Sequence, residues 1–297
     1  MLVSHRELHS PELGARYVNH MLLHSRFRVL INERSGIIED ETLLFPSFGR
    51  RLGVERSELI VCLAGKLRVR RPGFEAVLRP GEWLGENRGS GWYFRRDTSS
   101  IALILEWEPG LIGTRHIPQA ASGKLPANTF AAVRQVATTL SVTRDEMPTV
   151  APLLRQLLCL LRAEGLPFDD VEEGALIEEV PERMRTLCRT VDAALSSPKG
   201  QPMMIDLQEA TGRSRLPILS DLQEFNARYS FNAGGWRDVV QRWRMTNGMF
   251  LMSAPGATTE AVAARLGYSS PAALCHAFAK RGLPSPGALR ETLLRLG

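Results

Sequence analysis

Hydrophobic and polar positions follow two different periods along this chain. Between residues 58 and 107, short apolar runs give way to alternation, with Leu67 and Val69 set among basic residues. A period of two predicts β-strands. Ala64-Gly65, Pro72-Gly73 and Pro80-Gly81 predict turns between those strands. Several short strands with evenly spaced turns indicate a small barrel or jelly roll.

From residue 127 onward, apolar residues recur every three or four positions, which predicts helices. We expect helices at 128–140, 150–164, 181–195 and 236–252. The chain is therefore expected to be of the α+β class, with an N-terminal β-barrel or jelly roll, flanking helices and a C-terminal all-α domain.

The expected helix at 150–164 carries more leucines than one amphipathic stripe needs. Two interpretations are open. One face covers the barrel while the other meets a partner subunit, or the whole helix is buried in the core. The first interpretation assigns a dimer interface to Leu154, Leu157, Leu158 and Leu161.

A helix-turn-helix is predicted near the C-terminus. Thr258 is suited to begin a helix as its N-cap, and Gly267 to end it, because glycine tolerates positive φ. Ser270-Pro271 then reads as the N-cap and first residue of a second helix, whose apolar stripe contains Leu274 and Phe278. In such a motif the second helix enters a DNA major groove.

This region resembles the last segment of the AraC/XylS family of bacterial transcription regulators. The resemblance rests on Gly267, Tyr268, Ser269, Ser270, Phe278, Gly282, Ser285, Pro286 and Arg290. Leu274 departs from it, because the family usually has an aromatic residue there. The run GKLRVRRPGFEAVLRPGEW also resembles the cupin-like sensor domain found in many members.

The resemblance implies a cupin-like sensor domain at 1–126, a helical linker and dimerisation region at 127–179, and a DNA-binding domain with two helix-turn-helix units at 180–297. Implied partners are double-stranded DNA, a second copy of the chain, RNA polymerase and a small-molecule effector. A competing hypothesis is an effector-sensing or protein-interaction module that has lost sequence-specific DNA binding and acts on another regulator.

An internal repeat supports two units. A shift of 55 residues aligns Leu207 with Val262, Gly212 with Gly267, Ser214 with Ser269, and Leu219 with Leu274. The first unit departs from the family pattern in Pro217, which a helix tolerates only in its first turn, and in an outward Glu224. Glu224 is expected either to face phosphates or to accept from a cytosine amino group.

Candidate DNA contacts follow from these positions. In the second unit, alanine can touch a thymine methyl, histidine can donate to a base edge, and lysine or arginine can bind phosphate. The candidates there are Ser269, Ser270, Ala272, Ala273, His276, Lys280 and Arg281. Those of the first unit are Arg213, Ser214, Arg215, Ser220 and Glu224.

Charge and composition agree with these expectations. The 297 residues exceed a usual single domain, and the net charge of +5 is concentrated late. Residues 201–297 hold eleven basic and seven acidic side chains, which fits a DNA partner. Four scattered cysteines indicate a reducing cytoplasm. No apolar run is long enough for a membrane-spanning helix. The first residues lack the basic, apolar and small segments that make up a signal peptide.

The β region contains no histidine between residues 58 and 107, so a metal-dependent cupin enzyme is disfavoured and we expect neither metal nor cofactor. His5/His9 and His20/His24 are spaced as metal ligands on a helix would be, but solvated or hydrogen-bonded histidines are the preferred interpretation. No catalytic motif stands out.

An effector site is assigned to Arg68, Arg70, Trp83, Trp92 and Tyr93. The alternative is that these aromatic residues fill the barrel and the arginines are solvated.

Overall fold

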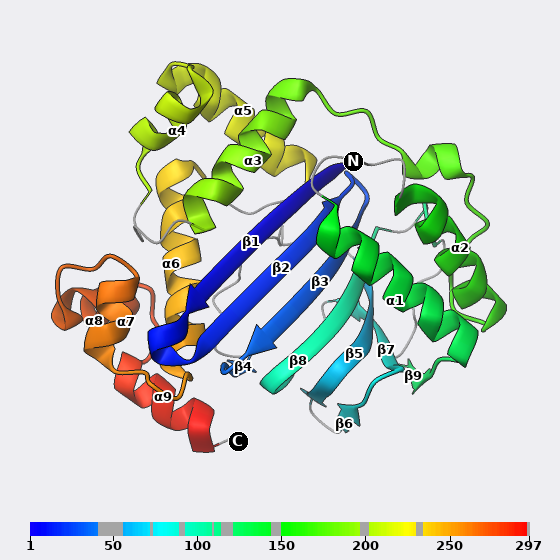
Figure 1. The fold of residues 1–297 in the computed structure, drawn as a ribbon, viewed down its shortest axis with the longest axis horizontal. Coiled ribbons are helices and arrows are strands. Elements are labelled where there is room, and N and C mark those ends of the chain that lie inside the picture. Colours follow the sequence, from blue (N-terminus) through cyan, green and yellow to red (C-terminus); the bar gives the residue numbers. More distant parts are fainter. Residues whose placement is uncertain are drawn as a thin grey trace.

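The computed structural model describes residues 1–40, 56–71, 74–88, 93–108, 110–113, 121–143, 150–196, 202–229 and 234–295. Within these residues, nine strands form one antiparallel sheet in the order β1-β2-β3-β8-β5-β7-β9, with β4 on β8 and β6 on β5 (Figure 1). The strands are β1 (Leu2–Ser10), β2 (Ala15–Leu23), β3 (Phe27–Ser35), β4 (Glu39–Asp40), β5 (Arg56–Arg71), β6 (Phe74–Leu78), β7 (Glu82–Arg88), β8 (Tyr93–Trp107) and β9 (Ala121–Lys124).

The helical part follows the sheet in the sequence. Its helices are α1 (Ala127–Val142), α2 (Val150–Ala163), α3 (Glu182–Ser196), α4 (Met204–Thr211), α5 (Arg215–Arg228), α6 (Trp236–Met252), α7 (Thr259–Arg265), α8 (Pro271–Lys280) and α9 (Pro286–Arg295). Short 3-10 turns lie at η1 (Pro11–Leu13) and η2 (Glu173–Leu176). The prediction of an α+β chain with an N-terminal β region and a C-terminal helical region is confirmed.

Strands β1 to β3 are the part of the fold that the hydrophobic pattern did not reveal. Polar side chains occupy buried positions in all three strands, among them Ser4, Arg6, Asn19, Asn32 and Arg34. The buried face of these strands therefore lacks the regular row of apolar residues by which a strand is recognised in a sequence. The interpretation of His5/His9 and His20/His24 as helix-spaced pairs is wrong, because His5 and His9 lie in β1, His20 lies in β2, and His24 directly follows β2.

The expected turn at Ala64-Gly65 is also absent. Strand β5 continues through it, and its pairing with β8 shifts register between Cys62 and Ala64 and again between Gly65 and Leu67. Gly65 has φ +72, and a Cβ there would lie 2.1 Å from the Ser99 oxygen. Glycine thus marks a β-bulge in a long strand here instead of a turn between two short ones.

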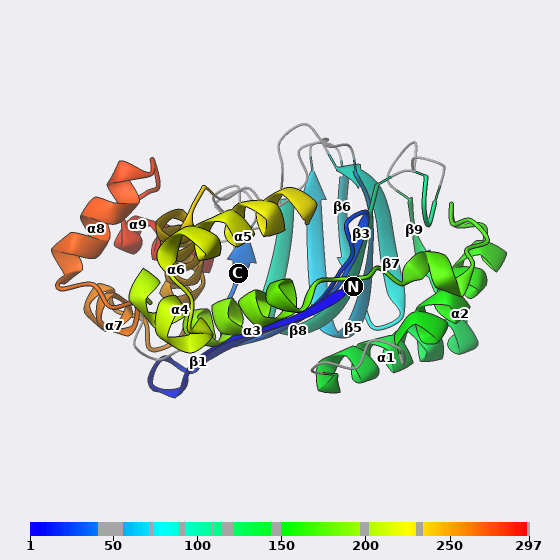
Figure 2. The ribbon, with the colours of Figure 1, turned by 90° about the horizontal axis from the view of Figure 1, so that it is seen from above.

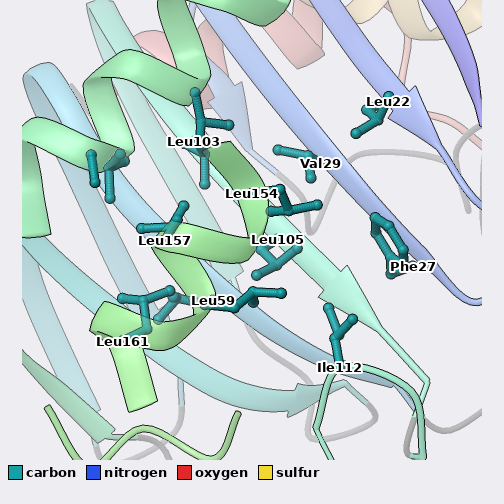
Figure 3. Close-up of a cluster of buried hydrophobic side chains, with 14 of the residues drawn as sticks. Leu22, Phe27, Val29, Leu59, Leu103, Leu105, Ile112, Leu154, Leu157 and Leu161 are labelled. Atoms are coloured by element: carbon teal, nitrogen blue, oxygen red, sulfur yellow. The ribbon is translucent and has the colours of Figure 1, made fainter. Parts of the chain in front are cut away.

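Helices α1 and α2 cover one face of the sheet, as Figures 1 and 2 show. Their apolar side chains share a cluster with sheet residues such as Leu59, Val61, Leu103 and Leu105. Leu154, Leu157 and Leu161 project from α2 into this cluster (Figure 3).

The proposed dimer interface on α2 is therefore wrong. Leu154, Leu157, Leu158 and Leu161 are each no more than 1% exposed within a single chain. The other two leucines of α2, Leu153 and Leu160, are half-buried at the cluster's margin. The surplus of leucines arises because the helix lies deep in its own chain's core, which was the alternative interpretation.

Helices α3 to α9 gather at the β1 end of the sheet, on the other side of the molecule from α1 and α2 (Figures 1 and 2). A cluster with α3, α5 and α6 includes Leu2, Met21 and Leu23 from the strands. Another, with α6 to α9, includes Leu8 and Leu13. The helical region is thus packed directly on the first two strands.

Candidate nucleic-acid interface

The second unit, α7 to α9, begins its two main helices as the sequence predicts. Thr258 Oγ1 accepts a hydrogen bond from the Ala261 amide at 3.0 Å, and Ser270 Oγ accepts from the Ala273 amide at 3.1 Å. Gly267 follows α7 with φ +71. These contacts satisfy orphan amides at both helix starts and fix the angle at which α8 leaves the turn.

Two fully buried side chains hold α8 in place. Leu274 and Phe278 are 0% exposed and share a cluster with α6, α7 and α9. A Cβ on Gly248 of α6 would lie 3.1 Å from the Phe278 ring, so a small residue is needed where α8 crosses α6. The predicted apolar stripe is therefore the packed face of the helix, and the opposite face is left outward.

Two arginines that the motif alone does not explain brace this unit. The Arg244 guanidinium of α6 lies 3.7 Å from the centre of the Tyr268 ring, and burial lowers the pKa of Arg244 and raises that of Tyr268. Arg290 Nη1 donates to the Met252 and Ala254 carbonyls at 2.9 and 2.7 Å. Tyr268 and Arg290, both in the resembling segment, therefore have structural contacts.

The outward face of α8 carries the second unit's candidate contacts. Ala272, His276 and Lys280 are exposed, and Ala273 is half-buried. In the turn before it, Ser269 is exposed, whereas the Ser270 hydroxyl is used for capping. Arg281 is half-buried, and its Nη2 lies 3.8 Å from Asp238 of α6, so part of its charge is balanced within the protein.

The first unit, α3 to α5, has the same turn geometry. Gly212 ends α4 with φ +65, close to the value at Gly267. After the turn, however, the repeat slips by one residue: the buried residues Ile218 and Leu222 match Leu274 and Phe278 at a shift of 56. Leu219, which the sequence aligned with Leu274, is only half-buried. Pro217 lies in the first turn of α5, where a helix tolerates it.

The first unit's candidate contacts are partly bound to neighbouring side chains. Ser214, Arg215 and Ser220 are exposed. Arg213 Nη1 donates to the buried carboxylate of Asp221. Glu224 is exposed, but Arg183 Nη2 donates to both of its oxygens at 2.9 and 2.7 Å.

Arg183 is a further residue of the candidate interface, and sequence reasoning missed it. It lies on α3, and its Nη1 also donates to Asp221 at 2.6 Å. The bond to Glu224, followed by the charges of both acids, raises the pKa of Arg183. Its spacing of about forty residues from these acids leaves no local sequence signal.

This pairing changes what Glu224→Ala should do. The substitution removes a negative charge from the outward face and releases a guanidinium beside it, so binding to every duplex should strengthen at low salt, with sequence preference retained. The pair is exposed to solvent, so its loss should affect folding little. Binding isotherms on specific and scrambled duplexes measure this.

The exposed Glu173, which lies outside both units, supplies the control. Glu173→Ala changes the net charge equally and should leave affinity almost unchanged. Weaker binding of Glu224→Ala to its preferred duplex alone would instead identify Glu224 as a base reader.

Of the residues assigned to an effector site, the structure describes the side chains of Arg68 and Trp83. Trp83 packs against the cluster beneath α1 and α2, so it belongs to the core. Arg68 is half-buried, and its Nε has no hydrogen-bond partner among the described residues. Trp92 and the side chains of Arg70 and Tyr93 lie outside what the structure describes.

The opposite face of the sheet carries buried polar atoms that the sequence did not single out. Asn19, Asn32, Ala102 and Cys62 lie directly opposite one another across β2, β3, β8 and β5. Both asparagines are buried, and neither Oδ1 has a hydrogen-bond partner among the described residues. Unsatisfied buried acceptors are rare in folded proteins and mark places where a ligand or water completes the structure.

The histidines of β1 and β2 contact each other directly. His5 Nδ1 and His20 Nδ1 are 2.9 Å apart and lie opposite each other in the strand pairing. The preferred interpretation, hydrogen-bonded histidines, holds for this pair. In the described parts of the chain, no three His, Cys, Asp or Glu side chains gather into a possible metal site. No helix there has the length and apolar character needed to cross a bilayer.

Comparison with known proteins gives structural likenesses only. No family model and no curated protein matches the chain. CuxR, an AraC-like transcriptional activator, is 16% identical with a TM-score of 0.36, covering 84% of this chain and 85% of its own. Wild-type ToxT from Vibrio cholerae, with an unsaturated fatty acid bound, is 9% identical with a TM-score of 0.34, covering 92% and 96%. A putative glyoxylate-induced protein from Pseudomonas aeruginosa covers 40% of this chain and 44% of its own, at 13% identity and a TM-score of 0.28. The solved structures that resemble this chain over most of its length thus include ToxT and CuxR.

Proposed function

We propose that this protein is a DNA-binding transcriptional regulator of AraC/XylS type. The observation that carries the proposal is the pair of similarly built turns, each with a left-handed glycine, placed before and after the single helix α6. Two helix-turn-helix units joined in this way present α5 and α8 to successive major grooves.

The two units are proposed to contribute differently to DNA recognition. The outward face of α8 combines the exposed alanine Ala272 with His276 and Lys280, a set without carboxylates that can approach DNA closely. The outward face of α5 carries Glu224, balanced by Arg183. Base recognition is therefore assigned mainly to α8, and positioning on the phosphates to the arginines of the first unit.

The proposed setting is a reducing cytoplasm, which suits a chain whose four cysteines are scattered along the sequence. The regulator acts as a dimer through a surface other than the α2 leucines, and light scattering at micromolar concentration measures this state.

A small effector is proposed to bind on the sheet face that holds Asn19 and Asn32, whose amide oxygens suit a ligand that donates hydrogen bonds. No catalytic role is proposed.

Selection of duplexes from a random pool tests DNA recognition. The wild type should enrich one motif, and His276→Ala should relax the preference at one position of it. A direct base contact is worth about 1–3 kcal/mol, so binding to the preferred site should weaken about fivefold to 150-fold. Thr292→Ala, an exposed change on α9, is the control. An unchanged motif would remove His276 from base recognition.

The competing proposal is an interaction module that no longer reads DNA. Exposed Leu216 on α5 favours it, since 77% of its surface is accessible and a large apolar side chain there can contact a partner protein. Failure of the wild type to enrich any motif, together with no binding of duplex at low salt, would favour this second function.

A further inference from the structure

Strand β1 touches both helix-turn-helix units. In Figure 1 it runs past α3 and ends near α6 and α7, and hydrogen bonds join it to each unit. Its first half meets the first unit at α3, and its last residues meet the second unit at α7. Because β1 is also paired with β2 over its whole length, both units rest on one continuous sheet.

Side chains of α3 replace the missing neighbour of this edge strand. The His5 amide donates to Asp192 Oδ2 at 2.8 Å, the Glu7 amide to Ser196 Oγ at 3.2 Å, and Cys188 Sγ lies 3.7 Å from the Val3 carbonyl. On α3 these partners are spaced four residues apart, so they form one row on a single helix face. An edge strand with its backbone groups open tends to pair with other chains, and here a helix closes it.

Among these α3 side chains, Asp192 makes the most hydrogen bonds to β1. Besides the His5 amide, its carboxylate accepts from Ser4 Oγ at 3.0 Å and from Arg6 Nε at 2.9 Å. Asp192 and Arg6 are 6% and 8% exposed. A buried carboxylate with charged and neutral donors fixes geometry strongly, because losing any donor leaves charge unsatisfied.

The second unit is fastened to the far end of the same strand and to the turn that follows. Arg265 Nη2 donates to the His9 carbonyl at 2.9 Å, and the Gly256 amide donates to the Leu13 carbonyl at 3.2 Å. The apolar contacts divide in the same way: Leu2 joins the first unit's cluster, whereas Leu8 joins the second's.

We propose that β1 is a shared docking strand that fixes the position of the two units relative to each other, with Asp192 fastening the first unit. This rests on the proposed function only where DNA is concerned, since the docking itself is a property of the free protein. The strand sets how far apart α5 and α8 lie, and therefore which half-site spacing the protein accepts.

Asp192→Asn tests the docking in the full chain. The carboxylate of Asp192 accepts hydrogen bonds from three donors, and the isosteric amide would point its NH₂ group at one of them. The hydrogen-exchange rate of the His5 amide should therefore rise about tenfold or more. Glu182→Gln on the exposed end of α3 is the matched control and should leave that amide unchanged. Ser196→Ala, which removes only the acceptor of the Glu7 amide, is the milder second variant should Asp192→Asn unfold.

The position of the units is read from the distance between two spin labels. Exposed Ser220→Cys on α5 and Ala279→Cys on α8 carry them, with Cys159→Ser and Cys275→Ser in the background. The docked wild type should give one narrow distance distribution, and Asp192→Asn should broaden it about twofold or more. A distribution of unchanged width, with the His5 amide released, would overturn the shared docking strand.

A DNA experiment separates this failure from failure of the proposed function. On duplexes whose half-sites are moved apart by one base pair, the wild type should lose affinity and Asp192→Asn should lose about threefold less. Equal losses would also count against the docking strand. Absence of any duplex binding by the wild type would contradict the proposed function, while the label distances would still decide the docking.

Discussion

Replacing Leu154 and Leu158 together by glutamate is expected to unfold the N-terminal region. Both side chains are at most 1% exposed and lie in the cluster between α2 and the sheet. Burying two carboxylates there without partners costs more than about 5 kcal/mol in total, which is comparable to the stability of a whole domain. Loss of the far-UV circular dichroism of the sheet and a large drop in the urea midpoint measure this.

The control lies on the same helix. Gln156 is exposed, so Gln156→Glu adds a negative charge outside the core and should leave the urea midpoint almost unchanged. A stable, folded monomer of the double variant would contradict the core position of α2 and would return these leucines to a subunit interface.

Phe278→Ala is expected to disorder the second unit and abolish DNA binding. Phe278 is 0% exposed and shares a buried cluster with residues of α6, α7 and α9. Truncating a buried phenylalanine costs about 3–5 kcal/mol, which a unit of three short helices cannot absorb. Hydrogen exchange in α7 to α9 should increase strongly while the sheet stays protected.

Lys280→Ala, two residues later and exposed, is the stability control for this change. It should leave hydrogen exchange as in the wild type. If Phe278→Ala retained both protection in α8 and full duplex binding, α8 would not be the helix that reads DNA.

The sequence predicted the second unit closely because its signals are local. Thr258 and Ser270 cap the helices that follow them, and Gly267 adopts the positive φ that its place requires. The bounds of α6, Trp236–Met252, agree with the spacing of its apolar residues. Caps, turns and helical stripes act over a few residues, so a sequence reveals them directly.

Features that depend on distant partners were not predictable. Buried Ser4 and Arg6 lie between Leu2 and Leu8 on one face of β1 and obscured its alternation. The leucines of α2 suggested a partner subunit until the sheet beneath them was known. Glu224 seemed a free carboxylate because Arg183 is distant in sequence. The contacts of β1 with Asp192 and Arg265 join residues more than 180 positions apart, beyond any local pattern.

Binding of the purified wild type to its selected duplex, followed over several salt concentrations, tests the central claim most directly. The account predicts affinity that falls steeply as salt rises, as phosphate contacts require, and a slope flatter by about one counterion in Lys280→Ala. No binding of any duplex above background at low salt would contradict it.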